Sequence, residues 1–199
     1  QQEERLKFYK AIDLSKIKVL SFDLDNTLYD CQSVLTKAEN WFTTYLCDKY
    51  GLGGECVSYD YWAKIKSRIL HENMRLEDDV TLLRAVSLVE AFKEKGIPLK
   101  GGLDEALSLV HTFIEHRSAG IVHKEVFSFL DKLKVKYPLV AVSNGNLDPS
   151  KLNINQYFEY DLRPQLDKLH RKPHSDLFNE CANIMKVKND EILHIGDDP

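Results

Sequence analysis

The chain has 199 residues, of which 43% are hydrophobic and 29% charged, and its formal net charge is -4. This balance is typical of a globular domain, and nothing in it suggests a fibrous or disordered chain. The net negative charge argues against nucleic-acid partners, whose binding surfaces usually carry a basic excess. No apolar run approaches the roughly 20 residues that cross a bilayer, so we expect no membrane partner and a cytoplasmic protein. The four cysteines lack zinc-ligand spacing and are expected to be free thiols.

The first predicted strand lies at residues 17–24, IKVLSFDL. Its apolar and β-branched residues show no clean alternation, which is typical of a strand covered on both faces in a parallel sheet. The strand ends on two acids, Asp23 and Asp25.

Residues 31–120 have a different pattern. Apolar residues recur there at helical spacing, with breaks at 51–54 and 96–98, and predict about four amphipathic helices without a convincing strand. Three arginines in this segment are possible contacts for an anion, although solvated surface arginines are the commoner case: Arg68, Arg75 and Arg84.

Strands and helices alternate in the last part of the chain. Runs at 138–144 and 191–197 read as buried strands, and 157–163 as a strand nearer an edge. Helical spacing recurs between them, so the fold class predicted is α/β, a doubly wound, Rossmann-like parallel sheet. The predicted organisation is a core of residues 1–30 and 121–199, interrupted by an inserted all-helical domain at 31–120. Ligands bind such sheets beyond the carboxyl ends of the strands.

The D-x-D-x-T pattern of Asp23 and Asp25 has several interpretations. Aspartates favour turns at strand ends for local reasons. A calcium loop is disfavoured because Leu28 stands where the EF-hand turn requires glycine. Two close carboxylates raise each other's pKa unless a cation compensates, and Mg²⁺ is the natural candidate. Phosphoryl transfer follows, with Asp23 attacking phosphorus and Asp25 acting as general acid and base.

Two later segments offer partners for a phosphate. Asn144-Gly145 could form a hairpin turn, but a helix start follows it, so Ser143 and the backbone amides at Asn144 and Gly145 are predicted to bind an anion. Lys172 precedes Pro173 and is therefore held outside a helix, from where its ammonium could offset charge in the site. A simple solvated lysine is the alternative.

The run at 191–197 ends on Asp197, followed by Asp198. A parallel sheet would bring these acids beside Asp23 and complete an oxygen-ligand Mg²⁺ site. None of the seven histidines forms a metal-ligand motif, and His194 inside a predicted strand is expected to have a packing role.

Four motifs together resemble the haloacid dehalogenase (HAD) superfamily of aspartate-nucleophile phosphatases, and they occur in this order: FDLDNTLYD, AVSNGN, RKPHSDLF and HIGDDP. The inserted helices resemble that superfamily's cap. The resemblance implies Mg²⁺-dependent hydrolysis through an aspartyl-phosphate on Asp23, with Asp25 as acid and base. It assigns phosphate contacts to Ser143, Asn144 and Lys172. It assigns the metal to the side chains of Asp23 and Asp197 and the carbonyl of Asp25, with Asp198 close by.

The amino-acid sequence of the core segments is most similar to that of the bacterial phosphatases that dephosphorylate the phosphoribitylamino-pyrimidine intermediate of riboflavin biosynthesis. The expected substrate is a small soluble phosphate ester, with that intermediate and flavin mononucleotide (FMN) as candidates. Three alternatives stay open: a phosphomutase, a dehalogenase, which Asp25 argues against, and a catalytically silent scaffold. The superfamily's last motif normally continues to a further acid, a helix and a strand, so we expect the full protein to extend beyond Pro199.

Overall fold

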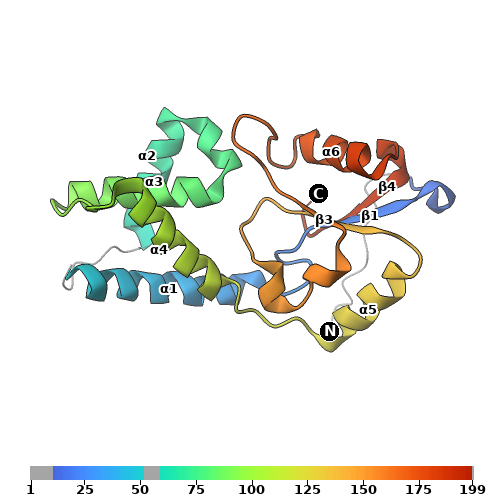
Figure 1. The fold of residues 1–199 in the computed structure, drawn as a ribbon, viewed down its shortest axis with the longest axis horizontal. Coiled ribbons are helices and arrows are strands. Elements are labelled where there is room, and N and C mark those ends of the chain that lie inside the picture. Colours follow the sequence, from blue (N-terminus) through green and yellow to red (C-terminus); the bar gives the residue numbers. More distant parts are fainter. Residues whose placement is uncertain (1–10, 52–58, 199) are drawn as a thin grey trace.

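The computed structural model describes residues 11–51 and 59–198 of the chain. A group of helices lies at one end of the molecule and a sheet between two helices at the other (Figure 1). The strands are β1 (Val19–Phe22), β2 (Leu139–Val142), β3 (Tyr160–Leu162) and β4 (Ile192–Ile195). The helices are α1 (Cys31–Tyr50), α2 (Tyr59–Glu72), α3 (Val80–Glu94), α4 (Gly102–Arg117), α5 (Lys124–Lys134) and α6 (Asp176–Met185). Short 3-10 helices are η1 (Leu14–Lys16), η3 (Met74–Asp78), η4 (Pro149–Leu152), η5 (Asn155–Tyr157) and η6 (Asn189–Glu191).

The sheet is parallel throughout, in the order β3-β2-β1-β4. Ser21 of β1 is in register with Val140 of β2 and His194 of β4. The order reverses because the chain moves outward from β1 to β3 and returns to β4 on the other side of β1. This topology confirms the predicted doubly wound α/β fold, with β3 at the edge.

Alternate residues of β1 pack on opposite faces of the sheet, as the pleat requires. Leu20 and Phe22 share a cluster with Leu130 of α5. Val19 shares another with Leu177 of α6. Figure 1 shows α5 and α6 on opposite sides of the strands. Burial on both faces explains why the sequence of β1 is apolar without alternation.

Helices α1 to α4, called here the insertion helices, have hydrophobic clusters of their own. Phe42, Leu88 and Phe113 belong to one, which joins α1, α3 and α4, and a second joins α2 and α3. Local chemistry sets the ends of α1: the Asp30 side chain accepts hydrogen bonds from two backbone amides of the first turn, and Gly51 closes the helix at φ 63°.

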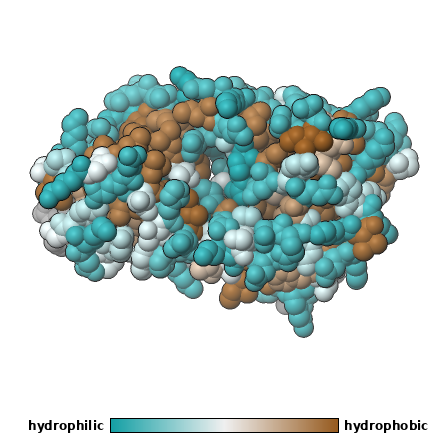
Figure 2. All heavy atoms as spheres, viewed as in Figure 1, coloured by the Kyte–Doolittle hydropathy of each residue, from teal (hydrophilic) through white to brown (hydrophobic). Residues whose placement is uncertain are grey.

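The surface is mixed in character. Figure 2 shows hydrophilic side chains over most of one face, with hydrophobic groups scattered between them. No helix in the described residues is long and apolar enough to span a membrane. The expectation for the cysteines is met only in part: Cys31 and Cys181 are free and buried, whereas Cys47 is disulfide-bonded. Cys56 lies outside the described residues.

Candidate active site

The carboxyl ends of β1, β2 and β4 meet at one edge of the sheet. The Asp23 amide donates to the carbonyl of Ile195 in β4 at 2.9 Å, which aligns the first acid with the loop after β4. A Cβ added at Gly196 would lie 3.4 Å from the Asp23 Cβ. The acids predicted from the first and last strands therefore lie at the same edge.

Asp23 is paired with Lys172. The Lys172 ammonium lies 3.3 Å from Asp23 Oδ1, and both side chains are mostly buried, at 14% and 16% exposure. The Leu24 amide donates to the same oxygen at 2.9 Å. Burial raises the pKa of the Asp23 carboxyl and the nearby Asp197 charge adds to this, so it stays above its ordinary value although Lys172 lowers it.

Asp25 points to a different cation. Arg117, the last residue of α4, donates to both carboxylate oxygens of Asp25, at 3.2 and 2.9 Å. The Tyr29 hydroxyl also donates to Asp25 Oδ1. Burial raises the pKa of the Asp25 carboxyl, but hydrogen bonding and charge from Arg117 outweigh burial and lower it below its ordinary value. The chain thus supplies each of the two neighbouring acids with a cation, whereas the sequence pattern suggested a metal ion for the pair.

Asn144 joins the loop after β2 to the loop that carries Lys172. Its side-chain amide donates to the Lys172 carbonyl at 3.0 Å, and its oxygen accepts from the Lys172 amide at 2.8 Å. The hydroxyl of Ser143 is buried and accepts from the Gly145 amide at 3.3 Å. The predicted phosphate contacts Ser143, Asn144 and Lys172 therefore form one connected group, in which the Asn144 side chain is already engaged.

His194 stands behind Lys172. Its Nε2 lies 3.5 Å from the ammonium, and its Nδ1 lies 2.8 Å from the Ser21 hydroxyl. Burial and the charge of Lys172 lower the pKa of His194 to about 4, so the ring is neutral near pH 7. A neutral ring can accept from Lys172 at Nε2 while Nδ1–H donates to Ser21. His194 also packs edge-on against Phe178, so the predicted packing role is accompanied by a polar one.

The arginines suggested as anion contacts are engaged elsewhere. Arg68 pairs with Glu94, Arg84 with Glu39, and Arg75 with Asp167 in the loop after β3. All three are paired with neighbouring acids, so none is the simply solvated arginine of the alternative.

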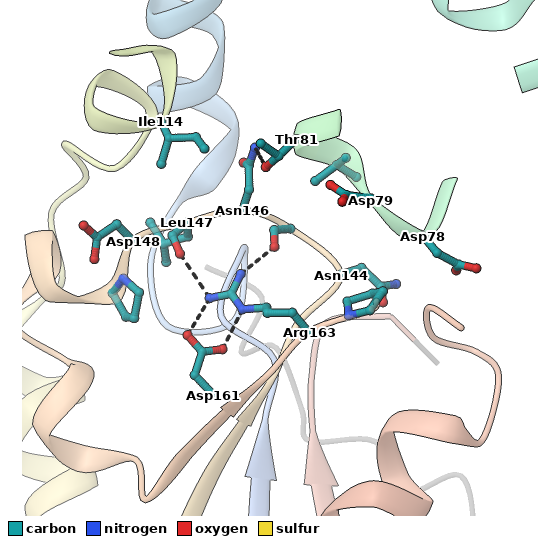
Figure 3. A pocket seen from close by; sticks show the side chains of 14 residues that line it. Asp78, Asp79, Thr81, Ile114, Asn144, Asn146, Leu147, Asp148, Asp161 and Arg163 are labelled. Atoms are coloured by element: carbon teal, nitrogen blue, oxygen red, sulfur yellow. Dashed lines mark hydrogen bonds and ion pairs between the residues drawn. The ribbon is translucent and has the colours of Figure 1, made fainter. Parts of the chain in front are cut away.

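A cavity of about 390 Å³ lies between the insertion helices and the loops after β2 and β3 (Figure 3). Thr81 and Ile114 line it from the helices, and Asn144, Gly145 and Asn146 from the core. Its floor carries Arg163, which donates to Asp161 and to the carbonyls of Gly145 and Leu147. The Asn146 amide donates to the Thr81 hydroxyl at 3.3 Å across the cavity. Because Gly145 also borders Asp25, the cavity adjoins the candidate catalytic residues.

The family model for haloacid dehalogenase-like hydrolases matches residues 17–199. This chain belongs to that family. It is 30% identical over 193 residues to the 5-amino-6-(5-phospho-D-ribitylamino)uracil phosphatase YigB of Escherichia coli strain K12, covering 97% of this chain and 79% of YigB. It is 23% identical to the N-acylneuraminate-9-phosphatase of Rattus norvegicus, over 92% of this chain and 75% of that enzyme.

Among solved structures, the haloacid dehalogenase-like fold of this chain is similar to a 2-haloacid dehalogenase from Pseudomonas syringae pv. Tomato DC3000. The TM-score is 0.83 at 28% sequence identity, covering 92% of this chain and 79% of that structure. The predicted superfamily and the predicted hydrolase class are confirmed.

The donor set of this haloacid dehalogenase-like hydrolase fits a hard cation. Lys172 and Leu24 both contact Oδ1 of Asp23, which leaves Oδ2 without a partner among residues 11–51 and 59–198. Asp197 is exposed, and its charge raises the pKa of Asp23, so the two carboxylates lie near each other. No group of three or more His, Cys, Asp or Glu side chains in the described part of the chain could hold a metal by itself. A site would therefore need a backbone oxygen and water, which suits Mg²⁺.

Several residues of the candidate site were not predicted from the sequence. Arg117 and Asp25 are 92 positions apart and no local pattern links them. Tyr29 was within the quoted motif but carried no separate signal. Ser21 reads as an ordinary strand residue, but a serine inside a strand predicted to be buried on both faces needs a polar partner, and that was a usable signal; in the structure its side chain is 0% exposed.

Proposed function

We infer that the chain is a phosphomonoester hydrolase that uses Asp23 as nucleophile. The observation that carries this proposal is the buried pair of Asp23 and Lys172 at the carboxyl edge of the parallel sheet. A positive charge 3.3 Å from the carboxylate favours its ionised form and attracts a phosphate to the same place. The relationship to two phosphatases supports the reaction class.

In the proposed first step, a carboxylate oxygen of Asp23 forms a bond to phosphorus and the bond between phosphorus and the ester oxygen breaks. Asp25, which is ionised at rest because Arg117 lowers its pKa, first takes up a proton from solvent and then gives it to the leaving oxygen, so the products are an alcohol and an aspartyl-phosphate. In the second step, water attacks phosphorus, Asp25 takes a proton from it, and Asp23 is regenerated as inorganic phosphate leaves.

Other groups would hold the phosphate during both steps. Lys172 and the Ser143 hydroxyl can donate to its oxygens, and the backbone amides near Gly145 can add further donors. Asn144 contributes indirectly, since its hydrogen bonds fix the backbone of Lys172. When bound at Asp23, Asp197 and the Asp25 carbonyl, Mg²⁺ would offset the charge of the phosphoryl group. Asp198, exposed beside Asp197, stays without an assigned role.

The proposed substrate is a small phosphate ester whose alcohol part lies in the cavity of about 390 Å³ beside Gly145. The hydroxyl of Thr81 and the side-chain amide of Asn146 could bind a polyhydroxylated group there. The relationship to YigB makes the phosphoribitylamino-uracil intermediate the first candidate, and FMN carries a similar ribityl phosphate. Residues 31–120 would then be the cap of a core formed by 1–30 and 121–199. The cytoplasmic location stays a prediction.

One assay tests the mechanism. Phosphate release from an aryl phosphate is measured with Mg²⁺, with a chelator, and with Asp23→Asn, using the full-length protein. We expect turnover only for the unaltered protein with Mg²⁺. Equal activity with chelator would contradict the metal dependence, and full activity of Asp23→Asn would contradict the nucleophile. A panel of phosphorylated metabolites, including the two candidates, then identifies the substrate.

A second function has one specific observation in its favour, the similarity to a 2-haloacid dehalogenase structure. The same protein is therefore assayed for halide release from a 2-haloacid. Halide release without phosphatase activity would replace the proposal. Absence of both activities would favour a silent scaffold, and interconversion of phosphate isomers would favour a phosphomutase.

A further inference from the structure

Arg117 of the insertion connects α4 to the candidate general acid. Its side chain is 4% exposed and donates to Asp25, to the Tyr29 hydroxyl at 3.2 Å and to the Cys31 sulfur at 3.5 Å. All these partners belong to the seven-residue stretch that leads from β1 into α1. A single side chain at the end of the insertion therefore contacts both the candidate acid and the segment that supports it.

Stability alone is a weak reason for such an arrangement. Removing a guanidinium from water costs several kcal/mol, and replacing a buried ion pair by apolar groups is often neutral. The Arg117 Nε is buried and has no hydrogen-bond partner among the described residues, so the compensation is incomplete. The presence of a buried arginine at position 117 is therefore better explained by an effect on the groups that it contacts.

The geometry gives that reason. The two terminal nitrogens of Arg117 each contact a different oxygen of Asp25, at 3.2 and 2.9 Å, so the plane of the carboxylate is set by the plane of the guanidinium. The Tyr29 hydroxyl holds one of those oxygens as well. On the other side, the space for Asp25 Oδ2 exists only because residue 145 is glycine.

We propose that Arg117 is the positioning residue of the general acid: it sets the orientation in which Asp25 presents its carboxyl group to the leaving oxygen. This proposal rests on the proposed function of Asp25. It makes proton transfer in the core depend on a residue supplied by the insertion. Attack by Asp23 does not pass through Arg117, so the two parts of the reaction can be separated.

The test uses two substrates that need an acid to different degrees. An aryl phosphate such as p-nitrophenyl phosphate has a stable leaving group, whereas a simple alkyl phosphate leaves as an alkoxide that needs a proton. We expect Arg117→Met to lower kcat/KM for the alkyl ester by about tenfold more than for the aryl ester, with Asp25→Asn showing a larger difference of the same kind. Arg84→Met is the matched control, because Arg84 is also a paired arginine on the insertion but contacts Glu39.

A double-mutant cycle tests whether the effect of Arg117 on alkyl ester turnover depends on Asp25. If Arg117 acts through Asp25, then Arg117→Met has no further effect on the alkyl ester once Asp25→Asn is present. A uniform loss on both esters, or a full additional loss in the double variant, would overturn the proposal while leaving the role of Asp25 intact. Unchanged alkyl turnover in Asp25→Asn would instead remove the role of Asp25, and the proposal for Arg117 with it.

Circular dichroism and thermal unfolding check that the variants fold. If Arg117→Met does not fold, Arg117→Ala with and without millimolar guanidinium ion, and Arg117→Lys, replace it. If the added ion restores the ratio of kcat/KM for the alkyl ester to that for the aryl ester, positioning by the two terminal nitrogens of the guanidinium is supported. Arg117→Lys should then show a ratio between those of Arg117→Ala and the unaltered protein. If Arg117→Ala and Arg117→Lys both keep the alkyl-to-aryl ratio of the unaltered protein, the positioning role of Arg117 is contradicted.

Discussion

The Lys172 ammonium lies 3.3 Å from Asp23 Oδ1, and His194 Nε2 lies 3.5 Å from the same ammonium. Lys172 is thus held between the candidate nucleophile and a neutral histidine. Its position is determined from two sides, and its charge is directed to the place where a phosphate would bind.

Replacing Lys172 by methionine removes this charge. We expect Lys172→Met to lower kcat by about 100-fold or more, because the buried carboxylate and the phosphate would then repel each other without compensation. The acid limb of the pH-rate profile should move to higher pH, since Lys172 is a cause that lowers the pKa of Asp23. Lys168→Met, in the same loop and exposed, is the control and should behave as the unaltered protein.

Gly145 leaves room for Asp25. A Cβ at this position would lie 2.4 Å from Asp25 Oδ2, and the carboxylate is already held by Arg117 and Tyr29. We expect Gly145→Ala to displace Asp25 and to slow alkyl phosphate turnover by about tenfold or more. Gly196→Ala, whose Cβ would lie 3.3 Å from the nearest atom, should cost less. The measurement is kcat for both variants, and equal losses would contradict the argument.

His194 predicts a dependence of stability on pH. Its pKa is lowered from 6.5 to about 4 in the folded state, so the unfolded chain binds more protons below pH 6.5. The stabilisation from this group is therefore complete above about pH 6.5 and is lost as pH falls, by about 2 kcal/mol at pH 5 and about 3 kcal/mol at pH 4. Urea unfolding at pH 7.5 and pH 5 should show a smaller difference for His194→Gln than for the unaltered protein. The exposed His111→Gln should leave the difference unchanged.

The insertion helices have a hydrophobic cluster of their own, so a substitution there should lower stability without changing the preference between alkyl and aryl esters. Leu88 is 0% exposed within that cluster, so Leu88→Ala should reduce the free energy of unfolding by about 3 kcal/mol. The alkyl-to-aryl ratio should remain normal at temperatures where the variant is folded, because Leu88 belongs to a cluster that contains no candidate catalytic residue. A changed ratio would show that Asp25 is sensitive to the packing of the whole insertion rather than to Arg117.

The strands were predictable because a strand buried on both faces appears in the sequence as a continuous run of apolar residues. Apolar runs that end in Asp23, Ser143 and Asp197 show both the strand and the edge at which it stops, and a parallel sheet then brings those ends together. The parts that were not predictable depend on distant residues. Asp25 and Arg117 meet only after the insertion has folded, and Arg75 is taken up by Asp167 of the core.

The interpretation of the paired acids shows the same limit. The spacing predicted repulsion between Asp23 and Asp25, balanced by a shared cation, whereas the acid whose charge raises the pKa of Asp23 in the structure is Asp197. Which cation could not be read from the sequence, since many of the 27 basic residues were available and none is adjacent to the motif. The structure supplies Lys172 for one acid and Arg117 for the other.

The reciprocal hydrogen bonds between Asn144 and the backbone of Lys172 tie together two loops that follow different strands, beside the proposed phosphate site. A shift of either loop would carry the other with it and displace the proposed phosphate contacts of both loops together. Specificity for a different ester could therefore change most readily through substitutions in the insertion helices that face these loops, because such substitutions leave the two linked loops in place.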